Sequence, residues 1–177
     1  VPEGDKGFWV DWADGTRLYE TWVMREALPF VERTYRTRGR HIAGISMGGA
    51  GALFFVLHHP GVFESAAVLS GPTLDAKGMT EIRSSWVSRV FLLLDRVFGD
   101  TDDEARKRRS DPFQRWKRPE DLHGLRLFIA HGDDDVLGIG DTNAALHAHL
   151  EAAGIPHRYE VFRGRHNWQA WEPLSVS

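Results

Sequence analysis

The sequence predicts one α/β domain of three layers, a parallel sheet with helices on both faces. Short apolar stretches bounded by turn residues, each suited to a buried strand, recur at residues 40–45, 65–69, 125–131 and 158–162. The segments between them carry apolar residues at helical spacing, and alternating strands and helices form such sheets. With 177 residues, 42% of them hydrophobic, we expect a single domain spanning residues 1–177.

The first elements of the chain are a loop and a helix. The short aromatic segment 8–12 lies between turn residues and is expected to be a loop. Residues 20–35 form the first predicted helix, because Met24 and Leu28 belong to an apolar pattern of helical spacing. Pro29 lies inside this helix, and we expect a kink there because proline removes a backbone hydrogen-bond donor.

A Gly-x-Ser-x-Gly motif at residues 44–48 joins the predicted strand 40–45 to the predicted helix 49–58. A sharp strand-to-helix turn of this kind strains its serine and exposes the hydroxyl, while the flanking glycines let strand and helix pack without a clashing Cβ. The helix directs its amino end at the serine, so the backbone N–H of Met47 is placed to meet an oxyanion. Ser46 is therefore the candidate nucleophile. The alternative is a glycine-rich turn with an incidental serine.

Residues 72–122 form a predicted insertion rich in charged residues. Within it, Trp86, Val90 and Leu94 lie at helical spacing and give a broad apolar face. Two interpretations stay open. The face packs on the core, or it forms one wall of an acyl-binding pocket, as lid-like insertions above a sheet do.

A serine nucleophile needs a base, and the base needs an orienting acid. Residues 131–136 follow a predicted strand at the end where catalytic groups gather in open α/β sheets, and they include three aspartates. Asp135 is the predicted acid, because it stands fourth in a Gly-x-x-Asp loop and can point back over the sheet. For Asp133 and Asp134 a solvated turn or a weak site for a hard cation is the better interpretation.

The predicted base is His166, which lies in the loop after the last predicted strand. This gives the chain order serine, acid, histidine that is usual for such a turn. The base should act in its neutral form.

The chain has nine histidines, and the others lack this context. His58 and His59 end a predicted helix, where we expect them to cap carbonyl groups. His147 and His149 lie two apart on a helix, hence on different faces, and make a poor pair of metal ligands. His157 precedes a strand.

Composition excludes several classes of function. The net charge is −3 and the basic residues form no long stripe, which argues against nucleic acid and anionic membrane surfaces as partners. Because cysteine is absent, disulfides, thiol catalysis and cysteine-ligated metals are excluded. No apolar run reaches membrane-spanning length, and there is no recognisable targeting segment, so both a cytoplasmic and a secreted location stay open.

Several stretches together resemble the α/β-hydrolase esterases of the esterase D and tributyrin esterase type, which are related to the antigen 85 mycolyltransferases. The resemblance covers nearly the whole chain, at residues 8–12, 26–29, 44–53, 59–63, 69–71 and 166–171. It implies hydrolysis of small-molecule carboxylic esters through an acyl-enzyme, with Ser46, Asp135 and His166 as a triad and the Met47 N–H in the oxyanion hole. It implies no cofactor and no metal.

The chain departs from this family at its front, where family members have further strands and a loop that donates a second oxyanion N–H. We therefore expect the strand ending at Ile45 to be an apolar edge that pairs with a second copy or with the missing N-terminal segment. The loop around Asp11 and Trp12 is an alternative source of the second donor. Two other functions stay open: an acyltransferase with the same triad, and a binding protein on a truncated hydrolase scaffold.

Overall fold

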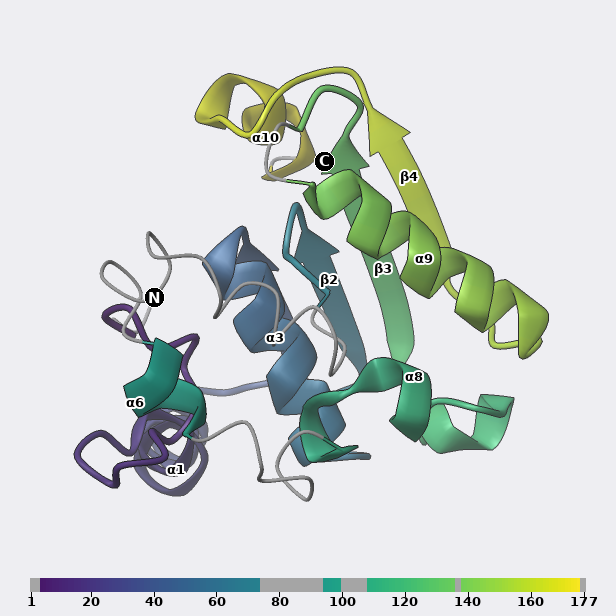
Figure 1. Ribbon diagram of the computed structural model, residues 1–177. Helices are drawn as coiled ribbons and strands as arrows, with labels where there is room; N and C mark the ends of the chain where they lie inside the picture. The colour runs from purple at the N-terminus through teal and green to yellow at the C-terminus, as the bar shows by residue number, and fades with distance from the viewer. Residues whose placement is uncertain (1–3, 74–93, 100–107, 136–137, 176–177) are drawn as a thin grey trace.

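A four-stranded parallel sheet forms the centre of the computed structural model, which describes residues 4–73, 94–99, 108–135 and 138–175 (Figure 1). The strands are β1 (His41–Ile45), β2 (Ser65–Leu69), β3 (Arg126–Gly132) and β4 (Arg158–Phe162). They lie side by side in chain order, and each neighbouring pair is parallel. The predicted strands and the α/β class are confirmed.

The helical elements alternate with the strands along the chain. They are α1 (Tyr19–Trp22), the π-helical turn η1 (Val23–Ala27), α2 (Leu28–Thr34), α3 (Met47–His58), α6 (Leu94–Phe98), α8 (Pro112–Arg115), the 3₁₀ turn η2 (Pro119–Leu122), α9 (Ile139–Ala152) and α10 (Trp168–Ser175). Figure 1 shows α3 and α9 on the same face of the sheet. Within the described residues, no helix combines the length and the apolar character needed to cross a membrane.

The main core lies between the sheet and these two helices. In the first four residues of β2 and of β3, alternate side chains are buried, among them Val68 and Ile129, while Ala67 and Phe128 remain partly exposed. This period of two is the pleat of a strand. Helix α3 is buried along nearly its whole length, because it packs on the sheet with one side and on a second apolar cluster with the other.

The second cluster joins three separate parts of the chain. Its buried members are Phe8, Val10, Trp12, Ala50, Phe54, Leu94, Val97 and Phe98. The aromatic segment 8–12 is irregular, as expected, but its side chains are core residues. Leu94 is likewise buried in this cluster, whereas Trp86 and Val90 lie outside the described residues. The lid-like role of residues 72–122 stays a prediction.

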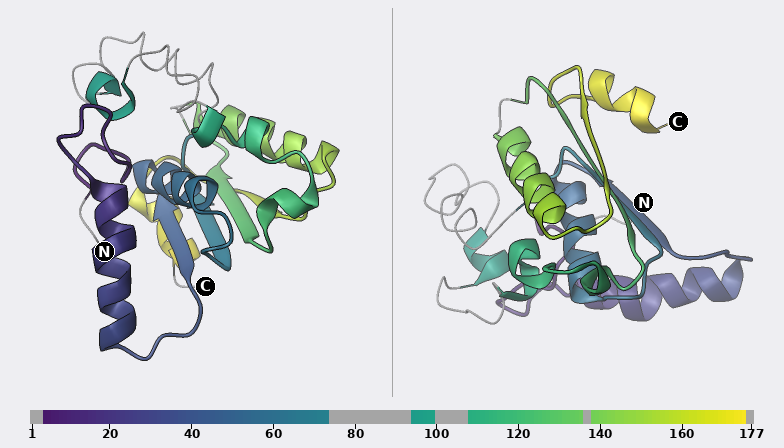
Figure 2. Two further views of the ribbon diagram at one scale, coloured as in Figure 1. Left: turned by 90° about the horizontal axis from the view of Figure 1, so that it is seen from below. Right: turned by 90° about the vertical axis from the view of Figure 1, so that its right-hand side faces the viewer.

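The first helix runs without a break through α1, η1 and α2. Pro29 lies in the first turn of α2, directly after the π-helical turn. Proline cannot donate a backbone hydrogen bond, and the wider π-helical turn accommodates the loss of that bond. The irregularity expected at Pro29 is therefore this wide turn rather than a sharp kink. Figure 2 shows the second half of this helix extending away from the sheet, and Phe30, Val31 and Tyr35 are exposed there.

Strand β1 forms one edge of the described sheet. Within the described residues it pairs with β2 alone, and His41 and Ala43 are exposed. An edge at this position agrees with the sequence-based expectation. Its pairing with a second copy or with another segment stays a prediction.

Candidate active site

Ser46 occupies the turn between β1 and α3 in a strained conformation. Its φ of 57° and ψ of −122° lie where residues other than glycine are rare. The backbone N–H of Ser46 donates to the carbonyl of Leu69 at 2.8 Å, which ties the turn to the end of β2. Helix α3 begins at the next residue, Met47.

Two glycines make this turn possible. A Cβ on Gly44 would lie 1.9 Å from the carbonyl oxygen of Gly48, and one on Gly49 would lie 2.9 Å from the Cα of Gly71. Both neighbours are backbone atoms that cannot rotate away. A Cβ on Gly48 would instead meet the ring of Trp9 at 3.7 Å, an ordinary contact. Gly44 therefore has the expected packing role and Gly48 does not. Gly49, rather than Gly48, is the second glycine that lets the backbone pack closely.

The structure brings Ser46, His166 and Asp135 into one hydrogen-bonded chain. The Ser46 hydroxyl donates to Nε2 of His166 at 2.7 Å, and Nδ1–H of His166 donates to Oδ2 of Asp135 at 2.8 Å. These partners assign the tautomer of the imidazole. The Asp135 side chain is 0% exposed and that of His166 is 15% exposed, so the row of hydrogen-bonded side chains runs from the interior towards the surface.

Strand topology explains how residues so far apart in the sequence meet. Ser46 follows β1, Asp135 follows β3 and His166 follows β4. Because all four strands are parallel, their carboxyl ends share one edge of the sheet, where loops gather catalytic groups.

The three neighbouring aspartates have separate partners. Oδ1 of Asp133 accepts from the backbone N–H of Gly164 at 2.9 Å and so holds the loop that carries His166. Asp134 is exposed and forms an ion pair with Arg165 at 2.6 Å. Within the described residues, Asp135 is the aspartate of this run that contacts His166.

Two further residues position the imidazole, and sequence reasoning did not single them out. The ring of Trp171 meets the ring of His166 edge-on, with centroids 4.7 Å apart and planes at 88°. Nε1–H of Trp171 donates to Oγ of Ser70 at 3.0 Å, and Ser70 is fully buried. Both residues belong to stretches that carry the family resemblance, which was the available signal.

The backbone N–H of Met47, the predicted oxyanion donor, lies at the amino end of α3. Met47 opens α3, so its N–H belongs to the first turn, whose donors have no carbonyl partner within a helix. In the loop around Asp11 and Trp12, the alternative source of the second donor, two polar groups already have other partners. Trp12 N–H donates to the carbonyl of Arg17 at 2.8 Å, and the Asp11 carboxylate accepts from Thr21.

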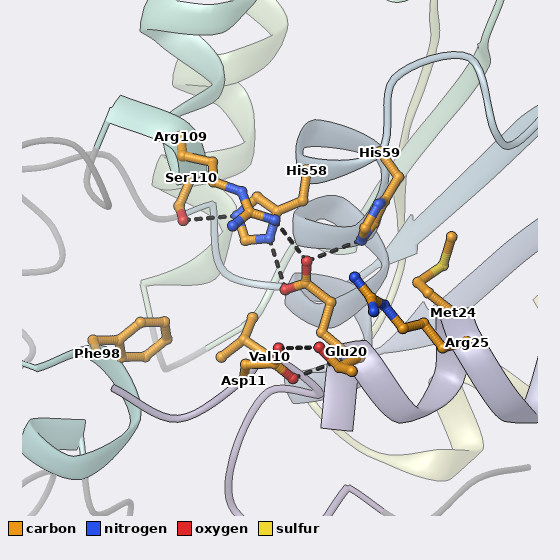
Figure 3. A pocket seen from close by; sticks show the side chains of 11 residues that line it. Val10, Asp11, Glu20, Met24, Arg25, His58, His59, Phe98, Arg109 and Ser110 are labelled. Carbon is orange, nitrogen blue, oxygen red and sulfur yellow. Dashed lines mark hydrogen bonds and ion pairs between the residues drawn. The ribbon is translucent and has the colours of Figure 1, made fainter. Parts of the chain in front are cut away.

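A second polar cluster lies at the other end of α3, beside a cavity of about 500 Å³ (Figure 3). The buried Glu20 carboxylate receives Nδ1–H of His58 and Nε2–H of His59, each at 2.9 Å, and pairs with Arg109 at 2.8 Å. The hydroxyl of Ser110 donates to Nε2 of His58 at 3.0 Å. Because His58 uses both ring nitrogens here, the expectation that it caps helix carbonyls is wrong.

Burial and hydrogen bonding set the protonation states of this cluster. Burial alone would raise the pKa of Glu20, but the hydrogen bonds from His58 and His59 outweigh it and hold that pKa well below its ordinary value. Burial lowers the pKa of His58, against the opposing effect of Glu20. The cluster therefore pairs an ionised carboxylate with a neutral imidazole at neutral pH.

Comparison with known proteins places the chain in a family. The family model described as putative esterase matches residues 9–174. The chain belongs to this esterase family. An esterase of Mycobacterium tuberculosis is 29% identical over 189 residues, an alignment that covers 94% of the chain and 41% of that relative. The chain thus spans less than half the length of this relative.

Solved structures of esterases and serine hydrolases share the fold. A ferulic acid esterase is 26% identical with a TM-score of 0.65, over 95% of this chain and 61% of that one. FphF, a fluorophosphonate-binding serine hydrolase of Staphylococcus aureus, has a TM-score of 0.76 at 22% identity, over 98% of this chain and 66% of that one. The resemblance drawn from the motifs is confirmed at the level of family and fold.

Proposed function

We propose that this chain is the catalytic part of a serine carboxylic ester hydrolase that works through an acyl-enzyme on short acyl or aryl esters. The observation that carries the proposal is the hydrogen-bonded chain from Asp135 through His166 to Ser46. Membership of the esterase family and the strained serine turn support it.

Each residue of the chain has a distinct part in the proposed reaction. His166 takes the Ser46 hydroxyl proton at Nε2 while the serine oxygen attacks the ester carbonyl. Asp135 holds the imidazole in the tautomer seen here and stabilises the imidazolium that forms. The Met47 N–H stabilises the oxyanion of the tetrahedral intermediate. His166 then returns the proton to the departing alcohol, and water activated by the same imidazole releases the acid.

A series of p-nitrophenyl esters of increasing acyl length, run beside a methyl ferulate assay, tests the substrate class. The ferulic acid esterase among the structural relatives motivates the aryl ester. We expect turnover of the shortest acyl esters or of the ferulate, and its loss in Ser46→Ala. An added alcohol that appears in an ester product in place of free acid would identify an acyltransferase instead.

A fluorophosphonate probe separates Ser46 from Ser110, another serine that contacts a histidine. Ser110 also lies in a serine–histidine–carboxylate chain, with His58 and Glu20, but it is buried and does not lie in a positive-φ turn before a helix. We expect labelling of the wild type and of Ser110→Ala, and none of Ser46→Ala. Labelling that survives Ser46→Ala would refute the assignment of the nucleophile.

A further inference from the structure

Three potential metal ligands meet at the carboxyl-terminal end of α9, on the surface of the molecule. They are His147 and Glu151 on the helix and His157 in the loop that leads into β4. Each of the three residues offers one ligand atom, and these three atoms all lie within 4.8 Å of one another. His147 and Glu151 are four residues apart on a helix, so they share one face.

The two imidazoles already direct nitrogen atoms at each other. Nδ1 of His147 lies 2.8 Å from Nε2 of His157. The opposite nitrogen of His157, Nδ1, donates its hydrogen to the carbonyl of Ile155 at 2.8 Å. In neutral His157 the lone pair is therefore on Nε2, facing His147. A backbone carbonyl that fixes the outer nitrogen is the usual second contact of a metal-binding histidine.

The other ligands are also set for coordination. The His147 ring is stacked on Tyr159, with centroids 4.1 Å apart and planes at 10°, which limits its rotation. Glu151 is exposed, and its carboxylate makes no hydrogen bond or ion pair with the residues that the structure describes. A flexible carboxylate can therefore complete a site that two oriented imidazoles begin.

We infer that His147, Glu151 and His157 form a binding site for a divalent transition-metal ion of the zinc type. Ligand atoms about 2.0 to 2.2 Å from a tetrahedral Zn²⁺ lie roughly 3.3 to 3.6 Å from one another. Nδ1 of His147 and Nε2 of His157, now 2.8 Å apart, need to separate by about half an ångström to bind the ion. The Glu151 carboxylate needs to move closer to both nitrogens. Imidazole nitrogens favour Zn²⁺, Cu²⁺ and Ni²⁺ over Mg²⁺ and Ca²⁺, which prefer oxygen.

An ion bound there would tie the end of α9 to the start of β4. It would be separate from the Ser46 site, because none of the three ligands takes part in the hydrogen-bonded chain of that site. Its effect is on stability, and its test does not depend on esterase activity.

Thermal unfolding of tag-free, chelator-treated protein tests the site. At a Zn²⁺ concentration a hundredfold above Kd we expect the wild-type Tm to rise by roughly 5 to 10 °C, and Mg²⁺ at the same concentration to leave it unchanged. Isothermal titration should give one ion per chain. Co²⁺ should give the intense visible absorption of a tetrahedral site.

Variants assign the ligands. His147→Ala and His157→Ala should each lower Zn²⁺ affinity at least tenfold, and Glu151→Gln should lower it by a smaller factor. His149→Ala is the matched control on the same helix, since His149 bonds the carbonyl of Trp116 and should leave the Zn²⁺-dependent shift intact. Each shift is measured within one variant, so a general loss of stability cancels. Wild-type protein without a shift, or an unchanged affinity in any of the three ligand variants, would overturn the site.

Discussion

The indole of Trp171 stands edge-on to the imidazole of His166, with ring centroids 4.7 Å apart, and the indole is itself held by a hydrogen bond to Ser70. The orientation of the imidazole therefore also depends on a side chain outside the hydrogen-bonded chain of Ser46, His166 and Asp135. An imidazole held from two sides, by a carboxylate and by a ring edge, keeps Nε2 directed at the Ser46 hydroxyl.

Replacing Trp171 by Phe should lower kcat by roughly 10- to 100-fold with little change in KM, because a displaced imidazole transfers the proton less well. Steady-state kinetics with a p-nitrophenyl ester measure this split. Trp168→Phe is the control, since Trp168 is 69% exposed and its ring packs against Trp171 without reaching the imidazole of His166 among the described ring contacts. Equal effects of the two replacements would contradict the positioning role.

Asp134 and Asp135 should differ clearly in the effect of substitution by Asn. Asp135→Asn should reduce kcat by about 10⁴, because an amide no longer selects the imidazole tautomer that accepts the serine proton. Asp134→Asn removes an exposed ion pair with Arg165, which is typically worth 0 to 1 kcal/mol, and should leave kcat within a few fold. Single-turnover kinetics of the two variants measure the difference. A loss of similar size in Asp134→Asn and Asp135→Asn would contradict the assignment of the acid.

The geometry of the turn around Ser46 predicts that alanine at Gly44 and alanine at Gly48 have opposite effects on stability. Gly44→Ala should destabilise the protein by ~3 kcal/mol or prevent folding, because its Cβ would meet the backbone carbonyl of Gly48 at 1.9 Å. Gly48→Ala should be neutral or stabilising by about 0.5 to 1 kcal/mol, because alanine favours the helix and meets only an ordinary contact. Urea unfolding of both variants tests the pair. A destabilised Gly48→Ala would show that the turn leaves no room at this position.

The buried cluster of Glu20, His58 and His59 should make the folded protein less stable as the pH falls. The folded-state pKa of Glu20 is below its ordinary value of 4.5, so its contribution is complete above pH 4.5 and is lost as the pH falls further. The folded-state pKa of His58 is also lowered from 6.5, so below pH 6.5 the unfolded chain takes up a proton that the folded chain does not. Both effects make the protein less stable as the pH falls.

Glu20→Gln tests this contribution. At pH 7 we expect it to cost about 1 to 3 kcal/mol of unfolding free energy, because it weakens buried hydrogen bonds to His58 and His59. The difference from wild type should shrink below pH 4.5. Glu26→Gln, an exposed position on the same helix, should stay within about 0.5 kcal/mol of wild type. A difference for Glu20→Gln that does not change between pH 7 and pH 3 would refute this account.

The strands and the serine turn could be predicted because their signals are local. An apolar run between turn residues identifies a strand such as β3, and the glycine spacing around Ser46 identifies the turn. Asp135 and His166 could be named because their order after Ser46 is diagnostic for this type of turn. The structure places the three together, and their catalytic roles stay predictions for the kinetic tests.

The residues that escaped prediction depend on contacts between distant segments. Glu20 meets His58 across 38 positions, and Trp171 meets Ser70 across 101 positions. Nothing near Glu20 in the sequence distinguishes a buried ligand of two histidines from an ordinary first-turn acid at a helix end. The contact of His147 with His157 escapes prediction for the same reason, because helical spacing relates His147 only to residues of its own helix, such as His149.

The sheet order has a consequence for how the molecule gains its function during folding. Ser46 follows β1 and His166 follows β4, the strands at the two edges of the described sheet, and 120 positions separate the two residues. Closing a loop of 120 residues costs roughly 4 kcal/mol of chain entropy, beyond a constant term. The proton-transfer pair therefore assembles only when all four strands have joined, so recovery of reactivity at Ser46 reports a late event of folding. Intermediates that contain β2 and β3 alone would have a compact core and no reactive serine.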